Sequence, residues 1–150
     1  MESIVKSIEV RVPVRSAYDQ WTRFEEFPRF MKGIEEVKRL DDKRLYWVAN
    51  IGDKYKEWHA EIVEQIPDER ISWRSRAGTM NSGAVIFNPI AKDKTLVTVQ
   101  INYEPESLTE KIGDMLGILS QQIEDNLERF KDFLESQNKE SNGSRSVQEP

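Results

Sequence analysis

Alternating apolar and polar residues run through most of the first hundred positions of the chain. This period of two is typical of a β-strand with one buried face. The pattern first appears from Ser7 to Val12, where Pro13 ends it. It recurs in six later segments, at residues 34–40, 44–51, 54–66, 70–76, 83–89 and 95–103. The connections between these segments are short and polar, so the sequence predicts about seven antiparallel strands.

Helical patterns lie between the first and second strands and at the end of the chain. Ser16 is positioned to cap a short helix ending at Phe24, and residues 26–31 form a second short helix containing Pro28. From Ser107 onward the apolar residues recur every three or four positions, and Glu110 completes a capping-box spacing. The apolar positions of this long amphipathic helix are Leu108, Ile112, Met115, Leu116, Leu119, Ile123, Leu127, Phe130 and Leu134.

This order of elements restricts the fold. A sheet with one apolar face needs a cover, and only the last helix is long and apolar enough to provide it. We therefore expect an α+β domain over residues 1–137, in which the antiparallel sheet wraps around the C-terminal helix and leaves an apolar cavity between them. Residues 138–150 hold too few apolar side chains to offset their ordering entropy, and a disordered polar tail is predicted there.

Composition excludes several classes of function. The 150 residues include no cysteine, which excludes a disulfide framework and cysteine-based metal sites and favours the cytoplasm. No export signal is expected, and no run of about 18 apolar residues predicts a membrane span. Acidic residues outnumber basic ones, 27 to 22, and the basic residues form no dense run. Nucleic acid is therefore not a predicted partner.

Large aromatic side chains are predicted to line the cavity. Trp47, Trp58 and Trp73 fall at inward positions of three successive strands, and Phe87 and Tyr103 share this parity on later strands. One interpretation is an aromatic wall for a flat or isoprenoid-like ligand, because ligand pockets are mostly apolar with few polar groups. The alternative is a solid core made of the same side chains.

Two connections are predicted to control entry to the cavity. The loop at residues 78–82 carries Met80 at its tip, and the segment at residues 27–34 contains Phe30 and Met31. Both would lie at one end of the sheet, where flexible apolar side chains act as lips of a pocket. The simpler alternative for Phe30 is packing against the long helix.

Two glycines interrupt the long helix. Gly113 and Gly117 each cost about 1 kcal/mol relative to alanine at such positions. Either they open space for a ligand beside Met115 and Leu119, or they allow close packing against the tryptophans of the strands.

A few polar residues are candidates for contact with a ligand. Ser75 lies on the inward face and Asn50 near a strand end, although both can instead form local hydrogen bonds. Arg74 and Arg76 point outward, where they pair with acidic residues of the neighbouring strand or capture an anion at the rim.

Catalytic and metal-binding patterns are weak. His59, the only histidine, is predicted to face solvent between Glu57 and Glu61, without the further ligands that a metal requires. No G-x-S-x-G elbow supports a nucleophilic serine. Glu36 is the only acid expected to face inward. We predict no metal and no cofactor.

Short motifs along residues 3–134 carry a resemblance to a known family. They are Val12-Pro13-Val14 with Ala17-Tyr18 and Trp21, Phe27-Pro28-Arg29-Phe30-Met31, Glu57-Trp58 with Ala60-Glu61-Ile62, Ile71-Ser72-Trp73, Gly83 with Val85 and Phe87, and Leu127-Glu128-Arg129-Phe130-Lys131. With these motifs the chain resembles the polyketide cyclase/dehydrase and coenzyme Q-binding branch of the START-like (SRPBCC) superfamily. The resemblance implies a helix-grip fold, in a family that includes lipid carriers, aromatase/cyclases and stress-related ligand binders.

Three functions are compatible with these patterns. The first is non-catalytic binding or transport of a small hydrophobic molecule, such as a lipid, an isoprenoid or quinone, or a polyketide-like compound. The second is a cyclase/dehydratase-type enzyme that uses the same cavity and needs a buried acid or base. The third is a protein-interaction module with an exposed apolar patch, for which no particular partner is predicted.

Overall fold

Seven antiparallel strands form one strongly curled sheet in the computed structural model, which describes the backbone of residues 2–103 and 112–148 and the side chains of residues 3–103 and 116–137. The strand order is β1-β7-β6-β5-β4-β3-β2. The bounds are β1 Glu2–Val10, β2 Ile34–Arg39, β3 Arg44–Ile51, β4 Lys54–Ile66, β5 Arg70–Gly78, β6 Asn81–Ala91 and β7 Lys94–Tyr103. The predicted number and direction of strands are confirmed.

Two short helices follow β1, as the sequence predicted. Helix α1 spans Val14–Trp21, and the 3-10 helix η1 spans Phe24–Arg29. The predicted cap at Ser16 is wrong, because the helix starts after Pro13, whose carbonyl oxygen accepts the backbone N–H of Ser16 at 3.0 Å. Proline already has a φ near −60°, so the chain enters the helix there without a side-chain cap.

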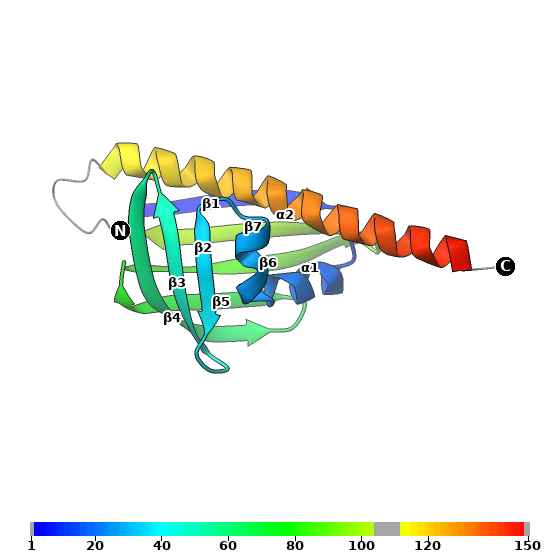
Figure 1. Ribbon diagram of the computed structural model, residues 1–150, viewed down its shortest axis with the longest axis horizontal. Coiled ribbons are helices and arrows are strands. Elements are labelled where there is room, and N and C mark those ends of the chain that lie inside the picture. Colours follow the sequence, from blue (N-terminus) through cyan, green and yellow to red (C-terminus); the bar gives the residue numbers. More distant parts are fainter. Residues whose placement is uncertain (1, 104–111, 149–150) are drawn as a thin grey trace.

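Helix α2, Ile112–Gln148, covers the open side of the curled sheet and contacts both β1 and β3 (Figure 1). It therefore bridges β1, at one edge of the sheet, and β3, which lies next to the strand at the other edge. The predicted helix start at Ser107, with Leu108 and Glu110, lies outside the described residues. Helix α2 continues through residues 138–148, and the predicted division into a domain ending at residue 137 and a polar tail stays a prediction. This segment contains no proline before Pro150, so nothing in it forces a helix to stop. Among the described residues, no helix is long and apolar enough to cross a membrane.

An aromatic cluster joins α1, η1 and α2 beneath the sheet. The Trp21 ring lies 5.3 Å from that of Phe27 and 4.9 Å from that of Phe130, both in edge-to-face geometry. The Phe30 ring stacks on Phe133 of α2 at 4.5 Å, which confirms the simpler alternative for Phe30. Aromatic pairs of this kind contribute about 0.5–1.5 kcal/mol each beyond their burial. The cluster holds one end of α2 in place and closes that end of the interior.

A β-bulge in β2 decides which of its side chains face the interior. The pairing with β3 shifts between Ile34 and Glu36, so that Ile34 and Val37 both pack inward. The expectation that Glu36 faces inward is therefore wrong. Its side chain is 46% exposed and its carboxylate lies 3.8 Å from Lys38 Nζ.

The turn between β3 and β4 brings this hairpin against α2. Gly52 and Asp53 have φ values of 59° and 64°, the signature of the two-residue type I′ turn that matches the twist of paired strands. A side chain at Gly52 would come within 3.1 Å of Ile118 on α2. Glycine thus serves both the turn and the close approach of the helix.

Candidate functional site

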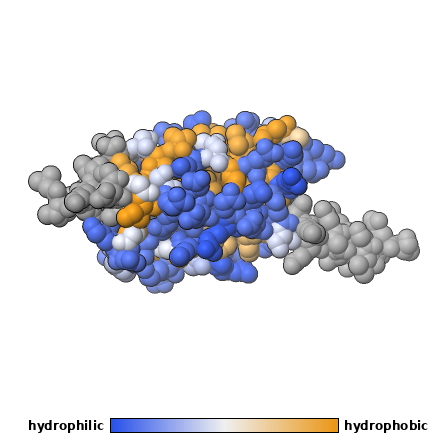
Figure 2. Space-filling view, turned by 90° about the horizontal axis from the view of Figure 1, so that it is seen from above, coloured by the Kyte–Doolittle hydropathy of each residue, from blue (hydrophilic) through white to orange (hydrophobic). Residues whose placement is uncertain are grey.

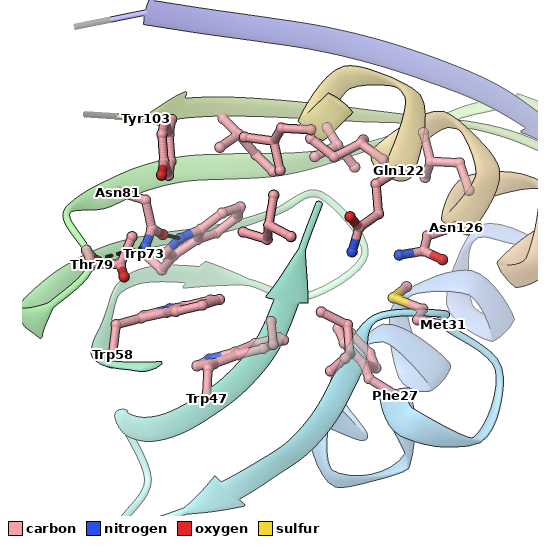
Figure 3. A pocket seen from close by; sticks show the side chains of 18 of the residues that line it. Phe27, Met31, Trp47, Trp58, Trp73, Thr79, Asn81, Tyr103, Gln122 and Asn126 are labelled. Carbon is pink, nitrogen blue, oxygen red and sulfur yellow. Dashed lines mark hydrogen bonds between the residues drawn. The ribbon is translucent and has the colours of Figure 1, made fainter. Parts of the chain in front are cut away.

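An apolar cavity of about 150 Å³ lies between the sheet and α2 and is partly open to the surface. Its wall combines residues from β3, β4, β5 and β7 with one side of α2 and with η1 (Figure 3). An apolar cavity of about this volume is known to hold a molecule the size of benzene. The interior is therefore not the solid core that the sequence left open as an alternative.

All four tryptophans of the chain line this cavity. Trp47 and Trp58 face each other across β3 and β4, with ring centroids 5.8 Å apart and planes only 5° from parallel. Together they make a flat floor, with Trp73 of β5 lying nearby in the same chamber (Figure 3). Trp21 of α1 closes the side next to η1. Flat indole surfaces of this kind favour flat apolar ligands.

The position of Trp73 depends on a glycine and an asparagine. Trp73 pairs with Gly83 across β5 and β6, and a Cβ atom at Gly83 would lie 2.8 Å from the Trp73 ring. Trp73 Nε1 donates a hydrogen bond to Asn81 Oδ1 at 2.9 Å, and Asn81 Nδ2 donates to the Thr79 carbonyl at 3.1 Å. The polar edge of the indole is thereby satisfied, and its ring remains available to the cavity.

Helix α2 forms the opposite wall with an apolar stripe and two carboxamides. The stripe consists of Leu119, Ile123 and Leu127. Asn126 bonds the backbone of Lys32 twice, accepting from its N–H at 2.9 Å and donating to its carbonyl at 3.0 Å. Gln122 Nε2 donates to the Asn50 carbonyl at 2.9 Å. Gly33, with a φ of 89°, leaves the room that the Gln122 amide occupies. The two carboxamides therefore attach two segments to α2, namely β3 and the loop that precedes β2.

Six of the residues predicted to contact a ligand line the cavity. They are Met31, Trp47, Trp58, Trp73, Tyr103 and Leu119. Their contact with a ligand remains a prediction. The side chain of Met115 lies outside the described residues.

Four other predicted residues lie away from the cavity wall. Phe30 packs on α2, as described above. The Phe87 ring packs edge-on against Tyr18, 5.5 Å away, in the core beneath the cavity. Ser75 is buried, but its hydroxyl donates to Met80 Sδ at 3.7 Å and accepts from the Asn81 backbone N–H at 3.0 Å. The local hydrogen-bonding alternative for Ser75 is therefore the one observed.

The structure also decides between the alternatives stated above for Gly117 and for Asn50. A Cβ atom at Gly117 would meet no described atom within 4 Å, so close packing does not explain this glycine. Gly113 lies outside the described side chains. Asn50 hydrogen-bonds Glu35 through its side chain and Gln122 through its carbonyl, which makes it part of the scaffold around the cavity.

Sequence reasoning missed several residues of the wall. Phe27, Thr79, Asn81, Gln122 and Asn126 line the cavity but were not predicted to contact a ligand, although Phe27, Thr79 and Asn81 lie in the two segments predicted to control entry. Gln122 and Asn126 are polar and were not among the residues predicted to line the cavity. Their spacing of four, flanking the apolar stripe, was the available signal, because residues four apart on a helix share one face.

The outer face of the sheet carries a small hydrogen-bonded cluster around Glu57. Tyr46 and Tyr55 both donate to Glu57 Oε2, at 2.6 and 3.1 Å. These two bonds hold the pKa of Glu57 below its usual range. The bond between Tyr46 and Glu57 also raises the pKa of Tyr46. His59 is exposed, as predicted, with its ring 5.1 Å from that of Tyr46. Among the described residues, no three carboxylates or histidines gather as a metal site requires.

Arginines on the same face pair with acids of the neighbouring strand. Arg76 binds both carboxylate oxygens of Glu61, at 2.9 and 2.8 Å, and Arg70 lies 3.4 Å from Glu64. The Arg76 guanidinium holds the pKa of Glu61 below its usual range. Of the two arginines expected to pair with acids of the neighbouring strand, Arg74 and Arg76, the pairing is confirmed for Arg76, and neither lines the cavity.

Exposed apolar residues are spread over several elements. The large ones are Val5, Leu40, Tyr55, Val63, Ile66, Met80, Ile90 and Ile118. On the face seen from the α2 side, apolar surface gathers toward the end where α2 begins and along one long edge, and hydrophilic residues cover most of the rest (Figure 2).

The cavity wall offers little for acid–base chemistry. Its described residues include no aspartate, glutamate, histidine, lysine or arginine. Lys56 is buried on β4 but does not line the cavity. The hydrophilic groups of the described wall are neutral hydroxyls, carboxamides and indole N–H groups, which can bind and orient a molecule.

Comparison with known proteins shows which family this chain belongs to. Residues 10–132 match a family model described as polyketide cyclase/dehydrase and lipid transport. An uncharacterised 17.2 kDa protein of Streptomyces lincolnensis, encoded between melC2 and rnhH, is 44% identical over 144 residues, covering 95% of this chain and 96% of that protein. These matches confirm the resemblance seen in the sequence.

Solved structures agree with the fold. A Deinococcus radiodurans protein is 30% identical with a TM-score of 0.67, covering 87% of this chain and 95% of its own. A START superfamily protein from Mycobacterium smegmatis (16% identical, TM-score 0.77, 88% and 98% covered) shares the fold. So does the Zhui aromatase/cyclase from a Streptomyces species (11% identical, TM-score 0.78, 89% and 93% covered).

Proposed function

Because the chain belongs to the polyketide cyclase/dehydrase and lipid transport family, with a START-like fold, we propose that it binds or carries a small hydrophobic molecule without transforming it. The observation that carries this proposal is the wall of the cavity. Four tryptophans and an apolar stripe of α2 surround it, and none of its described residues is a carboxylate, imidazole, ammonium or guanidinium group.

The size of the cavity indicates what part of a ligand it holds. A buried aromatic group removes about 150–250 Å² from water, which contributes about 4–6 kcal/mol at about 25 cal/mol per Å². Part of this is lost to the entropy of association, so one ring alone binds weakly. A lipid, an isoprenoid quinone or a polyketide-like compound would gain further affinity by extending through the open side of the cavity.

The two other functions have less support. A cyclase/dehydratase needs an acid or base beside its substrate, and Glu36, the candidate from sequence, lies on the outside. The likeness to an aromatase/cyclase at 11% identity concerns the fold alone. An interaction module would use exposed apolar residues. Here these residues are spread over β1, β4, β6, α2 and the connections between strands, which gives this function less support.

Indole N–H signals in a ¹⁵N NMR spectrum test this proposal directly, because every tryptophan of the chain lines the cavity. A hydrophobic ligand should shift all four indole signals and leave His59, on the outer face, unchanged. Ala49→Leu adds bulk to the cavity wall and should weaken binding. Ala77→Leu makes the same change in a groove on the outer face that shares no lining residue with the cavity, and it should leave binding unchanged. Shifts confined to outer-face residues would contradict the proposal.

A further inference from the structure

The side-chain amide of Gln122 has a defined orientation in the cavity wall. Gln122 extends from α2 toward the cavity (Figure 3). Its nitrogen lies 2.9 Å from the carbonyl oxygen of Asn50 and 3.5 Å from that of Lys32. Carbonyl oxygens only accept hydrogen bonds, so the NH₂ group must face them. The amide oxygen, Oε1, is then directed away from these carbonyls and has no hydrogen-bond partner among the described residues.

The other carboxamides of the wall are already engaged. Asn126 uses both its oxygen and its nitrogen on the backbone of Lys32. Asn81 accepts from Trp73 Nε1 and donates to the Thr79 carbonyl. Gln122 Oε1 therefore differs from the amide groups around it, because it is an acceptor held in place by bonds on the opposite side of the same amide.

The acceptor at Gln122 favours a ligand with a hydrogen-bond donor. The charge of the wall sets a second condition on the ligand. Burying a carboxylate costs several kcal/mol unless a cation or several donors pair with it. The described wall contains no lysine, arginine or histidine, and Gln122 presents an oxygen, which repels an anion. An uncharged group with an O–H or N–H donor meets both conditions.

We propose that the molecule bound here is uncharged and carries a hydroxyl or N–H group on a flat ring system, which lies on the indole floor and donates a hydrogen bond to Gln122 Oε1. This inference rests on the proposed function and specifies its ligand class. It distinguishes hydroxylated aromatic compounds from fatty acids and other carboxylates.

Three probes of the same shape test the inference by calorimetric titration at neutral pH. They are 2-naphthol, which donates a hydrogen bond, 2-methoxynaphthalene, which does not, and 2-naphthoate, which is charged. One net hydrogen bond is worth about 0.5–1.5 kcal/mol, so 2-naphthol should bind about three- to tenfold more tightly than the ether. The carboxylate should bind at least about tenfold more weakly than 2-naphthol.

Gln122→Met keeps the size of the side chain and removes the acceptor. It should bring the naphthol-to-ether preference close to one. Asn126→Leu is the matched control, because it loosens the same loop without removing Gln122 Oε1, and the preference should persist. Comparing ratios of affinities within each variant separates the role of the acceptor from any general loosening of the cavity.

The outcomes separate the two proposals. If none of the probes binds and larger hydrophobic compounds also shift no indole signal, the proposed function fails, and this inference fails with it. If only the larger compounds bind, this inference alone is refuted. If the naphthol and the ether bind the wild-type protein equally, or Gln122→Met and Asn126→Leu change the preference alike, only the role of Gln122 is refuted. Binding of 2-naphthoate as tight as that of 2-naphthol would refute the preference for uncharged ligands.

Discussion

Replacing Gly83 by alanine should destabilise the protein and displace one tryptophan of the cavity. A Cβ atom at this position would lie 2.8 Å from the Trp73 ring and would also clash with the Gln100 carbonyl oxygen. Relieving such overpacking costs about 1–3 kcal/mol, and losing the Trp73–Asn81 hydrogen bond costs about 1 kcal/mol more. The expected loss is therefore about 2–4 kcal/mol. For a domain of this size, it lowers Tm by about 5–15 °C.

Gly117→Ala provides the matched control, because the same substitution should have the opposite sign there. Gly117 lies within α2, and its added methyl group would meet no described atom within 4 Å. Alanine should therefore stabilise the helix by up to about 1 kcal/mol and raise Tm by a few degrees. Thermal unfolding followed by circular dichroism measures both variants. Unchanged stability of Gly83→Ala, or a loss in Gly117→Ala as large as that in Gly83→Ala, would refute this reasoning.

Three further predictions concern the outer face and the core. Arg76 keeps the pKa of Glu61 below its ordinary 4.5 in the folded state, so this contribution to stability is present above about pH 4.5 and is lost as the pH falls further. In urea unfolding, Glu61→Gln should lose less stability than the wild type between about pH 5 and pH 3. Hydrogen bonding to Glu57 raises the pKa of Tyr46 above its ordinary 10.0. Glu57→Gln should therefore bring a tyrosine ionisation, followed by ultraviolet absorbance, to lower pH, and an unshifted curve would contradict the bond. Phe130 is fully buried against Trp21, so Phe130→Ala should cost about 3–5 kcal/mol in chemical denaturation, and a loss below about 1 kcal/mol would contradict the packing.

Strand positions could be predicted from the sequence because the pattern of one buried face repeats with little interruption. The predicted bounds at residues 44–51 and 54–66 are those of β3 and β4. The pattern failed at Glu36, where a β-bulge shifts the parity of β2. A bulge depends on how two strands pair, so alternation within one strand does not reveal it.

The cavity wall was harder to predict than the sheet. Alternation shows which face of a strand a side chain occupies, but not how deep in the interior it lies. Phe87 therefore shares the parity of the cavity residues and yet belongs to the aromatic core below them. The amides of Gln122 and Asn126, which line the cavity, bind the backbone of β3 and of the loop before β2, both far away in the sequence. Such pairings depend on tertiary structure, which the spacing along α2 alone does not specify.

Native mass spectrometry of the purified protein, compared with a denatured sample, tests the central claim most directly. A small molecule should remain bound to the folded protein and be released on unfolding, with a mass that identifies an uncharged aromatic or isoprenoid-like compound. A folded protein that carries no molecule and also fails to bind a panel of such compounds would contradict the account, and the outer surface of the sheet would then become the candidate site.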